Sequence, residues 1–188
     1  MFSSRNLIAG LLALGFAADP AFAIPETLYS GDSPAESCAA GVAVPGAAST
    51  RLKRLCEDAL TDPSLRAGDR AATLANSGIV SLRLGDYDAA LARLDEARDA
   101  APANADIAIS YAATLLRLDR ADEAVAALAD IETISDGNRH IAYYNRALAH
   151  LALKDVEEAY RDFYVSAALK PGYAPAERAL AQFQVAAE

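Results

Sequence analysis

A repeat of about 34 residues constrains this chain more than any other feature of its sequence. Gly78, Ala112 and Ala147 are small residues spaced 34 and 35 positions apart. The same spacing recurs twelve positions further on, at Ala90, Ala124 and Ala159. A fixed period of this length is typical of stacked helical units, because no single unit can bury its apolar face alone. The sequence therefore predicts an all-α solenoid.

The composition supports a helical protein and argues against nucleic-acid binding. The chain has 188 residues, of which 53% are hydrophobic, and much of that fraction is alanine, the strongest helix former. The formal net charge is −9, and no block of basic residues is present. Because nucleic-acid binding needs clustered positive charge, we expect no nucleic-acid partner.

The first 23 residues have the layout of a secretory signal peptide. Arg5 precedes an apolar stretch, Leu7–Phe16, and Ala21–Ala23 forms a small-x-small cleavage site. The apolar stretch is shorter than the roughly 20 residues that a membrane-spanning helix needs. We therefore expect the mature chain to begin at Ile24 without a stable membrane anchor, and to be periplasmic if the source is a Gram-negative bacterium.

The segment that follows contains both cysteines of the chain. Residues 24–47 are rich in Pro, Gly, Ser and Ala, which predicts an irregular segment, and residues 48–68 predict a short helix and a connector. In an oxidising compartment, Cys38 and Cys56 are expected to form a structural disulfide that pins the irregular segment to this helix. The alternative is two free thiols.

Three helix-pair units and a terminal helix make up the rest of the chain. The predicted units cover residues 71–104, 105–138 and 140–173, and a capping helix covers 174–188. Short polar turns separate the two helices of each unit, at Gly85–Asp86, Asp119–Arg120 and Lys154–Asp155. Small residues at the repeated positions allow the two helices of a unit to approach closely.

These units resemble the tetratricopeptide repeat family. Residues 75–104 (ANSGIVSLRLGDYDAALARLDEARDAAPAN) are similar to its helix-turn-helix signature, and so are residues 143–163. The middle copy diverges, with Asp119 in place of the turn glycine. The helix within 48–68 resembles the second half of a degenerate preceding unit. The resemblance implies a right-handed α-α superhelix whose role is to bind other proteins.

The resemblance also implies a concave groove lined by the first helix of each unit. The residues expected in this groove are Asn76, Ile79, Leu82, Arg83, Ile109, Leu116, Arg117, Tyr144, Asn145 and Leu148. In related domains an asparagine at the position of Asn76 and Asn145 bonds the backbone of a bound peptide. The expected partner is an amphipathic or hydrophobic protein segment. The alternative is that the aliphatic members only pack against the terminal helix or the N-terminal segment.

No pattern of catalytic or metal-binding residues is present in the sequence. His140 and His150, the only histidines, lie about 280° apart around one helix, and we expect both at the surface or in the groove. We therefore expect no enzyme activity, metal or cofactor. The sequence favours a non-catalytic interaction module or scaffold in the periplasm. The alternatives are a self-associating structural protein, forming a homo-oligomer, and an accessory activator subunit of an envelope hydrolase or secretion complex.

Overall fold

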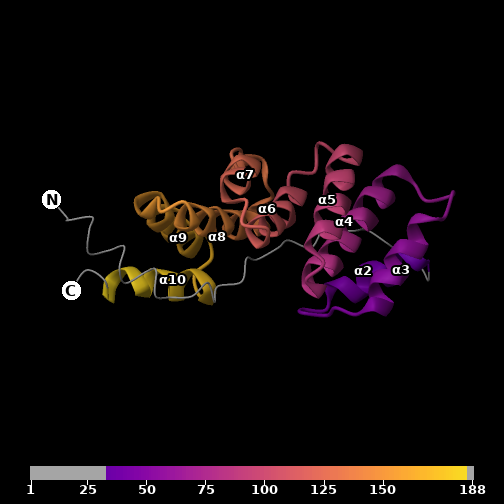
Figure 1. Cartoon of the computed structure of the whole chain (residues 1–188), viewed down its shortest axis with the longest axis horizontal. Helices are drawn as coiled ribbons and strands as arrows, with labels where there is room; N and C mark the ends of the chain where they lie inside the picture. Colours follow the sequence, from indigo (N-terminus) through magenta and orange to yellow (C-terminus); the bar gives the residue numbers. More distant parts are fainter. Residues whose placement is uncertain (1–32, 186–188) are drawn as a thin grey trace.

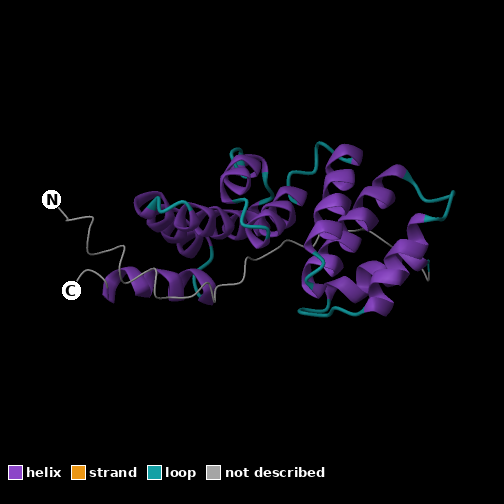
Figure 2. Cartoon of the chain, viewed as in Figure 1, coloured by secondary structure: helices purple, strands orange, loops and turns teal. Residues whose placement is uncertain are grey.

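The computed structural model describes residues 33–185, with side chains as far as Phe183, and all regular structure in that range is helical (Figures 1 and 2). The elements are α2 Pro34–Ala43, α3 Thr50–Leu60, α4 Ala67–Leu84, α5 Tyr87–Ala100, α6 Ile107–Arg117, α7 Ala121–Ala127, the 3₁₀ helix η1 Ile131–Thr133, α8 Asp136–Ala152, α9 Val156–Leu169 and α10 Ala174–Val185. The signal peptide expected at 1–23 lies outside the described residues.

The helices pack in consecutive pairs along an elongated stack (Figure 1). α4 packs against α5, α6 against α7 and α8 against α9, and each pair also contacts the next. The predicted all-α solenoid is therefore confirmed, although unit 1 begins at Ala67 and unit 3 at Asp136, both earlier than expected. No helix in the described range combines the length and apolar character that crossing a membrane requires.

The three turns within units share one backbone geometry. Gly85, Asp119 and Lys154 all adopt a left-handed conformation, with φ values of 80°, 58° and 69°. At each turn the next residue donates its backbone N–H to a carbonyl five positions back, as Asp86 does to Ser81 at 2.9 Å. This is the Schellman arrangement, which satisfies the last carbonyls of a helix. The turns therefore fix how each helix pair reverses direction.

In unit 1 the small position is a glycine, Gly78, which lies close to α5. A Cβ added to Gly78 would lie 2.6 Å from the Cγ atom of Leu94 and 3.2 Å from the carbonyl oxygen of Ala90. Around it, every residue of α4 from Thr73 to Leu82 is buried. α4 is thus enclosed on all sides by neighbouring helices, as expected for a helix at the centre of a core.

The second helix of unit 2 is shorter than the repeat pattern predicts. α7 ends at Ala127, whereas α5 and α9 each run for 14 residues. Leu128, Ile131 and Ile134 are all buried, and their spacing of three residues suits a 3₁₀ path. The slot that holds Ala97 in unit 1 and Ser166 in unit 3 holds Ile131 here. Because isoleucine needs more room than alanine or serine, the backbone leaves the helical path.

The expectation of an irregular segment at 24–47 is wrong for residues 34–43, which form α2. Ser33 accepts a hydrogen bond from the backbone N–H of Glu36, whose side chain in turn bonds the backbone of Ser33, and Pro34 occupies the first turn. These are strong helix-start signals. α2 packs against both α3 and α4, so α2 and α3 form a complete additional helix pair rather than half a repeat.

The expected disulfide joins the two helices of this N-terminal pair. The Sγ atoms of Cys38 in α2 and Cys56 in α3 are 2.09 Å apart, and both residues are fully buried. At the other end of the stack, α10 packs against α9 where the sequence predicts a capping helix. Ala176 and Phe183 face the stack, while Glu177 and Arg178 are exposed.

Candidate functional site

The predicted groove residues of unit 1 are buried, Ile79 beneath the N-terminal helix pair and Leu82 against Ala90 and Ala113. Asn76, Ile79 and Leu82 are at most 6% exposed. Ile79 belongs to a buried cluster with Cys38 and Val42 of α2. The prediction that these side chains line an open groove is therefore wrong, and the packing alternative is correct for Ile79.

Arg83, also expected to meet a partner, bonds the chain's own backbone. Its Nη1 atom donates to the carbonyls of Val42 and Ala47, both at 2.9 Å, and more weakly to that of Val44 at 3.4 Å. Burial lowers the pKa of Arg83 from its ordinary value. A cation at this point satisfies carbonyl groups at the C-terminal end of α2 and opposes the negative end of the helix dipole. Arg83 thus fastens α2 to the first repeat.

The predicted groove residues of unit 3 are buried beneath the C-terminal helix. Tyr144 is 2% exposed and Leu148 is 4% exposed, in a cluster with Phe163 and Phe183. The ring of Tyr144 lies 5.6 Å from that of Phe163 and 5.7 Å from that of Tyr173, centroid to centroid. The groove prediction is wrong for these two residues because α10 packs over them.

Asn145 acts between neighbouring repeats. Its Nδ2 atom donates a 3.3 Å hydrogen bond to the carbonyl of Ile109 in α6, and both residues are fully buried. An asparagine amide donates here to a backbone carbonyl, as the resemblance implies, but the carbonyl belongs to the preceding repeat. The buried positions of Asn145 and Ile109 do not support direct contact with a partner.

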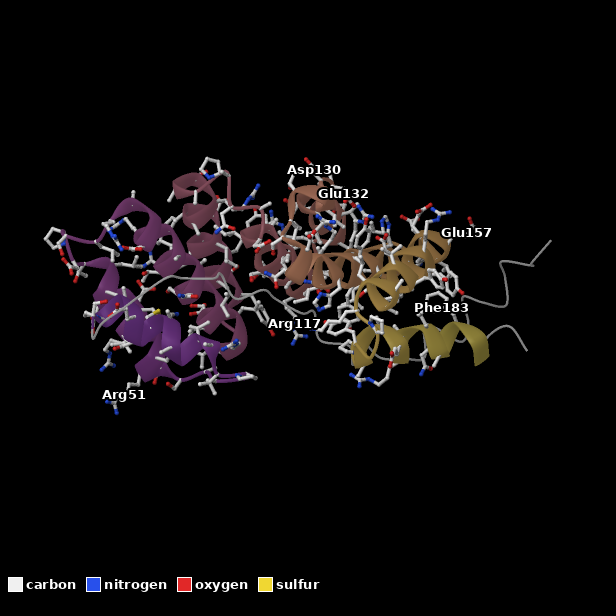
Figure 3. All side chains as sticks on the ribbon, turned by 180° about the vertical axis from the view of Figure 1, so that it is seen from behind. Arg51, Arg117, Asp130, Glu132, Glu157 and Phe183 are labelled. Atoms are coloured by element: carbon white, nitrogen blue, oxygen red, sulfur yellow. A yellow bond between two sulfur atoms is a disulfide. The ribbon has the colours of Figure 1, made fainter. Side chains whose placement is uncertain are left out.

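Two predicted groove residues remain accessible at the centre of the stack. Arg117 is exposed and Leu116 is half-buried, both at the end of α6. The guanidinium carbon of Arg117 lies 5.9 Å from the ring centroid of Tyr87, which is also half-buried. Figure 3 shows Arg117 between the N-terminal helices and α10. We call Tyr87, Leu116 and Arg117 the central surface. It combines one cation with apolar side chains, which suits a carboxylate beside an apolar residue.

His140 is buried, although both histidines were expected at the surface or in the groove; His150 is half-buried. It is 3% exposed, and its ring meets that of Tyr173 edge-on with centroids 4.8 Å apart. Burial lowers the pKa of His140 and raises the pKa of Tyr173, so both rings stay neutral near pH 7. Among the described residues, no three His, Cys, Asp or Glu side chains gather in a way that could hold a metal ion.

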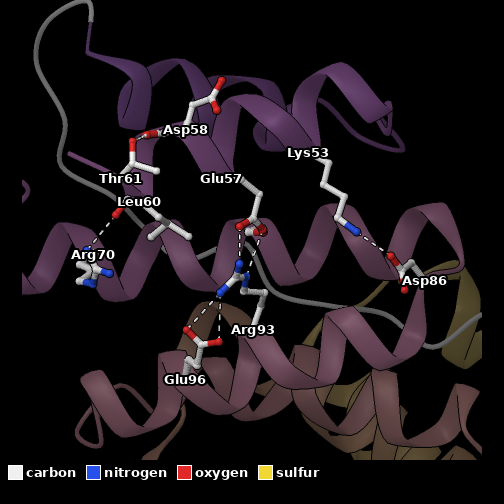
Figure 4. A network of polar contacts seen from close by, with 10 residues as sticks. Lys53, Glu57, Asp58, Leu60, Thr61, Arg70, Asp86, Arg93 and Glu96 are labelled. Atoms are coloured by element: carbon white, nitrogen blue, oxygen red, sulfur yellow. Dashed lines mark hydrogen bonds and ion pairs between the residues drawn. The ribbon is translucent and has the colours of Figure 1, made fainter.

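A polar network that sequence reasoning missed joins α3 to the first repeat (Figure 4). Arg93 of α5 donates from Nε to Glu57 of α3 at 3.0 Å, and a second bond links its Nη2 atom to the same carboxylate. Lys53 pairs with Asp86 at 2.6 Å, and this contact lowers the pKa of Asp86. The partners are more than 30 positions apart in sequence, so only the packing of α3 on α4 and α5 brings them together.

Comparisons with known proteins agree with this architecture. Residues 81–151 match a family model described as a tetratricopeptide repeat. Among solved structures, the first TPR domain of the human RPAP3 protein, determined by NMR, is similar with a TM-score of 0.59 and 25% sequence identity. The alignment covers 63% of this chain and 93% of that domain. A search of curated proteins finds no match.

Proposed function

We propose that this chain, whose residues 81–151 match a tetratricopeptide repeat model, is a non-catalytic adaptor that binds a partner protein through the central surface. Tetratricopeptide repeats are generally interaction scaffolds rather than enzymes. The observation that carries the proposal is the accessibility of Arg117 and Leu116, where the other expected groove residues are covered by α2 or α10 or packed between repeats. The function is argued from this site, since a fold alone does not define one.

The central surface favours a short acidic-apolar segment of the partner. The guanidinium of Arg117 is planar, a shape that matches a carboxylate, and it lies over the aromatic ring of Tyr87. Leu116 adds apolar contact beside the charge. Arginine and tyrosine are enriched among the residues that dominate binding energy. Arg117 and Tyr87 are therefore expected to supply most of the affinity for a short amphipathic segment.

We place the adaptor in the periplasm as part of the same proposal. The disulfide between Cys38 and Cys56 supports an oxidising compartment, where such bonds persist. The sequence pattern of residues 1–23 supports export across the inner membrane. N-terminal sequencing of the mature protein from a periplasmic fraction tests this part. A chain beginning at Ile24 is expected, and an intact Met1 in the cytoplasmic fraction would refute it.

The binding role is tested by crosslinking in cells with a photo-reactive residue at Leu116. Tyr144, the aromatic among the predicted groove residues, is unsuitable because it is buried. One adduct is expected that Arg117→Glu abolishes. The matched Arg51→Glu change, on exposed α3 at the far end of the stack (Figure 3), should leave the adduct unchanged. Equal loss in both variants would indicate a general charge effect and contradict the proposal.

The mass and activity of the adduct distinguish the alternative roles. An adduct of twice the chain mass would indicate a self-associating structural protein instead of an adaptor. An adduct with an envelope hydrolase, whose activity rises on addition of the purified chain, would specify an activator subunit.

A further inference from the structure

A hollow of about 380 Å³ opens between α5, the start of α6 and the end of α7. It exists because α7 ends at Ala127, where the second helices of the other units continue. In Figure 3, Asp130 on the rim of the hollow and Arg117 of the central surface lie at opposite edges of the stack. The hollow is therefore separate from the surface to which we assign the adaptor function.

The hollow has an apolar floor and an acidic rim. Ala105, Ala108 and Ile134 belong to the floor, and Ile134 is only 3% exposed. Asp99 and Asp130 belong to the rim, and both are exposed. An apolar floor beneath carboxylates is the environment in which a long cationic side chain can lay down its methylene groups and keep its charge hydrated.

The charges around the hollow do not balance within the described part of the chain. Arg98 is the one cation among the lining residues; it lies 3.7 Å from Asp95 and stacks on the ring of Tyr111 at 4.3 Å. No ion pair involves Asp99 or Asp130 among residues 33–185. Asp99 also lies in the last turn of α5, where the helix dipole adds negative potential. The rim is therefore electronegative.

We propose that this hollow is a second binding site, which receives a lysine or arginine side chain from a basic segment of a partner protein. The aliphatic stem of that side chain lies on the alanine and isoleucine floor, and its charge meets Asp99 and Asp130. The volume lies within the usual range of ligand pockets, roughly 300–1,000 Å³. The site uses no residue of the central surface, so either proposal can fail without the other.

The test uses NMR of the ¹⁵N-labelled protein and a capped hexapeptide of alternating lysine and alanine. Saturable shifts are expected for the amides of Asp99, Ala105 and Asp130, and added salt should weaken them. The Asp99→Asn/Asp130→Asn double variant should bind about fivefold more weakly, because each exposed ion pair contributes modestly. A hexapeptide with glutamate in place of lysine should give no shifts.

A matched variant separates the site from general attraction to an acidic protein. Asp58→Asn/Glu157→Gln changes the net charge equally at two exposed positions that do not line the hollow (Glu157 in Figure 3, Asp58 in Figure 4). It should bind the peptide like the original chain. Equal weakening in both double variants, or shifts spread evenly over the acidic surface, would overturn the proposal.

A third variant fills the hollow without changing its charge. Asn104 is an exposed lining residue whose backbone N–H donates to the carbonyl of Ala101. Asn104→Trp retains that backbone bond and places a large ring over the opening. Loss of peptide binding with an unchanged thermal melting curve supports the site. Unchanged binding by this variant would refute it.

Discussion

The two ends of the solenoid are fastened by different kinds of interaction. At the N-terminal end, α2 and α3 are held by a disulfide, by the bonds of Arg83 to carbonyls and by the Glu57–Arg93 ion pair. At the C-terminal end, α10 is held mainly by apolar and aromatic contacts. The ring of Phe183 lies 6.0 Å from that of Phe163 and 5.4 Å from that of Tyr160.

The two ends use different contacts because they bury side chains of different size. Two short helices at the N-terminal end bury few large side chains, so a covalent bond and charged contacts supplement the core. A single helix at the other end buries large rings, and rings provide much area per residue. Because repeats contact mainly their neighbours, each end should respond to its own perturbations. Four experiments test that independence.

The largest effect is expected from Phe163→Ala. Phe163 of α9 is fully buried against α8 and α10, so its truncation should cost about 3–5 kcal/mol of unfolding free energy. Urea unfolding measures this loss, and hydrogen exchange shows where it falls. Exchange should increase in α9 and α10 and remain slow in α3 and α4. Equal loss of protection at both ends would mean that the solenoid unfolds as one unit.

Removal of the disulfide should loosen the opposite end. The bond closes a loop between positions separated by 18 residues, and the chain-entropy model gives such a cross-link about 3 kcal/mol. The Cys38→Ala/Cys56→Ala variant should accordingly unfold at lower urea, with faster exchange in α2 and α3 alone. Reduction of the original chain is the control, because it adds no new side chain. Faster exchange in α10 would contradict the proposed independence.

The sequence predicts the repeats better than it predicts either end. The small residues at Gly78, Ala112 and Ala147 recur at a fixed spacing, so the helix pairs can be read directly. α2 was missed because its glycine and alanines show no apolar period, although Ser33 and Glu36 form a recognisable start signal.

The sequence predicts Leu116 and Arg117 as groove residues, but it does not predict that these two stay accessible while the others are buried, because that depends on what covers the first helices. A repeat pattern predicts which face of a helix points into the groove. Whether that face is buried depends on α2 and α10, which lie outside the three repeats. Ile131 was the available signal for the short α7, since it stands in a slot that otherwise holds alanine or serine. The hollow lies beside the end of α7, which the repeat pattern alone does not predict.

A smaller effect is expected from Glu57→Gln in the polar network. The change removes a charged partner of Arg93 while keeping the shape of the side chain, and should cost about 1 kcal/mol because the pair is partly exposed. Glu96→Gln is a matched control, since Glu96 bonds the same arginine within α5 at 3.0 Å. Only Glu57→Gln should speed exchange in α3. Equal effects would mean that the ion pair does not fasten the end.

The smallest effect is expected from mild acid, which should act on the C-terminal end alone. Burial, followed by the charge of Lys170, lowers the pKa of His140 in the folded protein below its ordinary value of 6.5. The unfolded chain therefore binds more protons as the pH falls below about 6.5, so stability is complete above that pH and declines below it. Asp86 stays ionised in this range because Lys53 lowers its pKa.

Hydrogen exchange at pH 7.5 and 5.5, corrected for intrinsic rates, measures this difference between the ends. Protection of α8 and α10 should fall at the lower pH, and that of α3 should not. His140→Phe keeps a ring against Tyr173 without a titrating group, and should remove the pH dependence, whereas His150→Gln should retain it. If His140→Phe loses protection at pH 5.5 like the original chain, another group is responsible. If the protection of α3 falls as well, the two ends are coupled. The difference between the charged contacts at one end and the aromatic contacts at the other would then not explain how the protein unfolds.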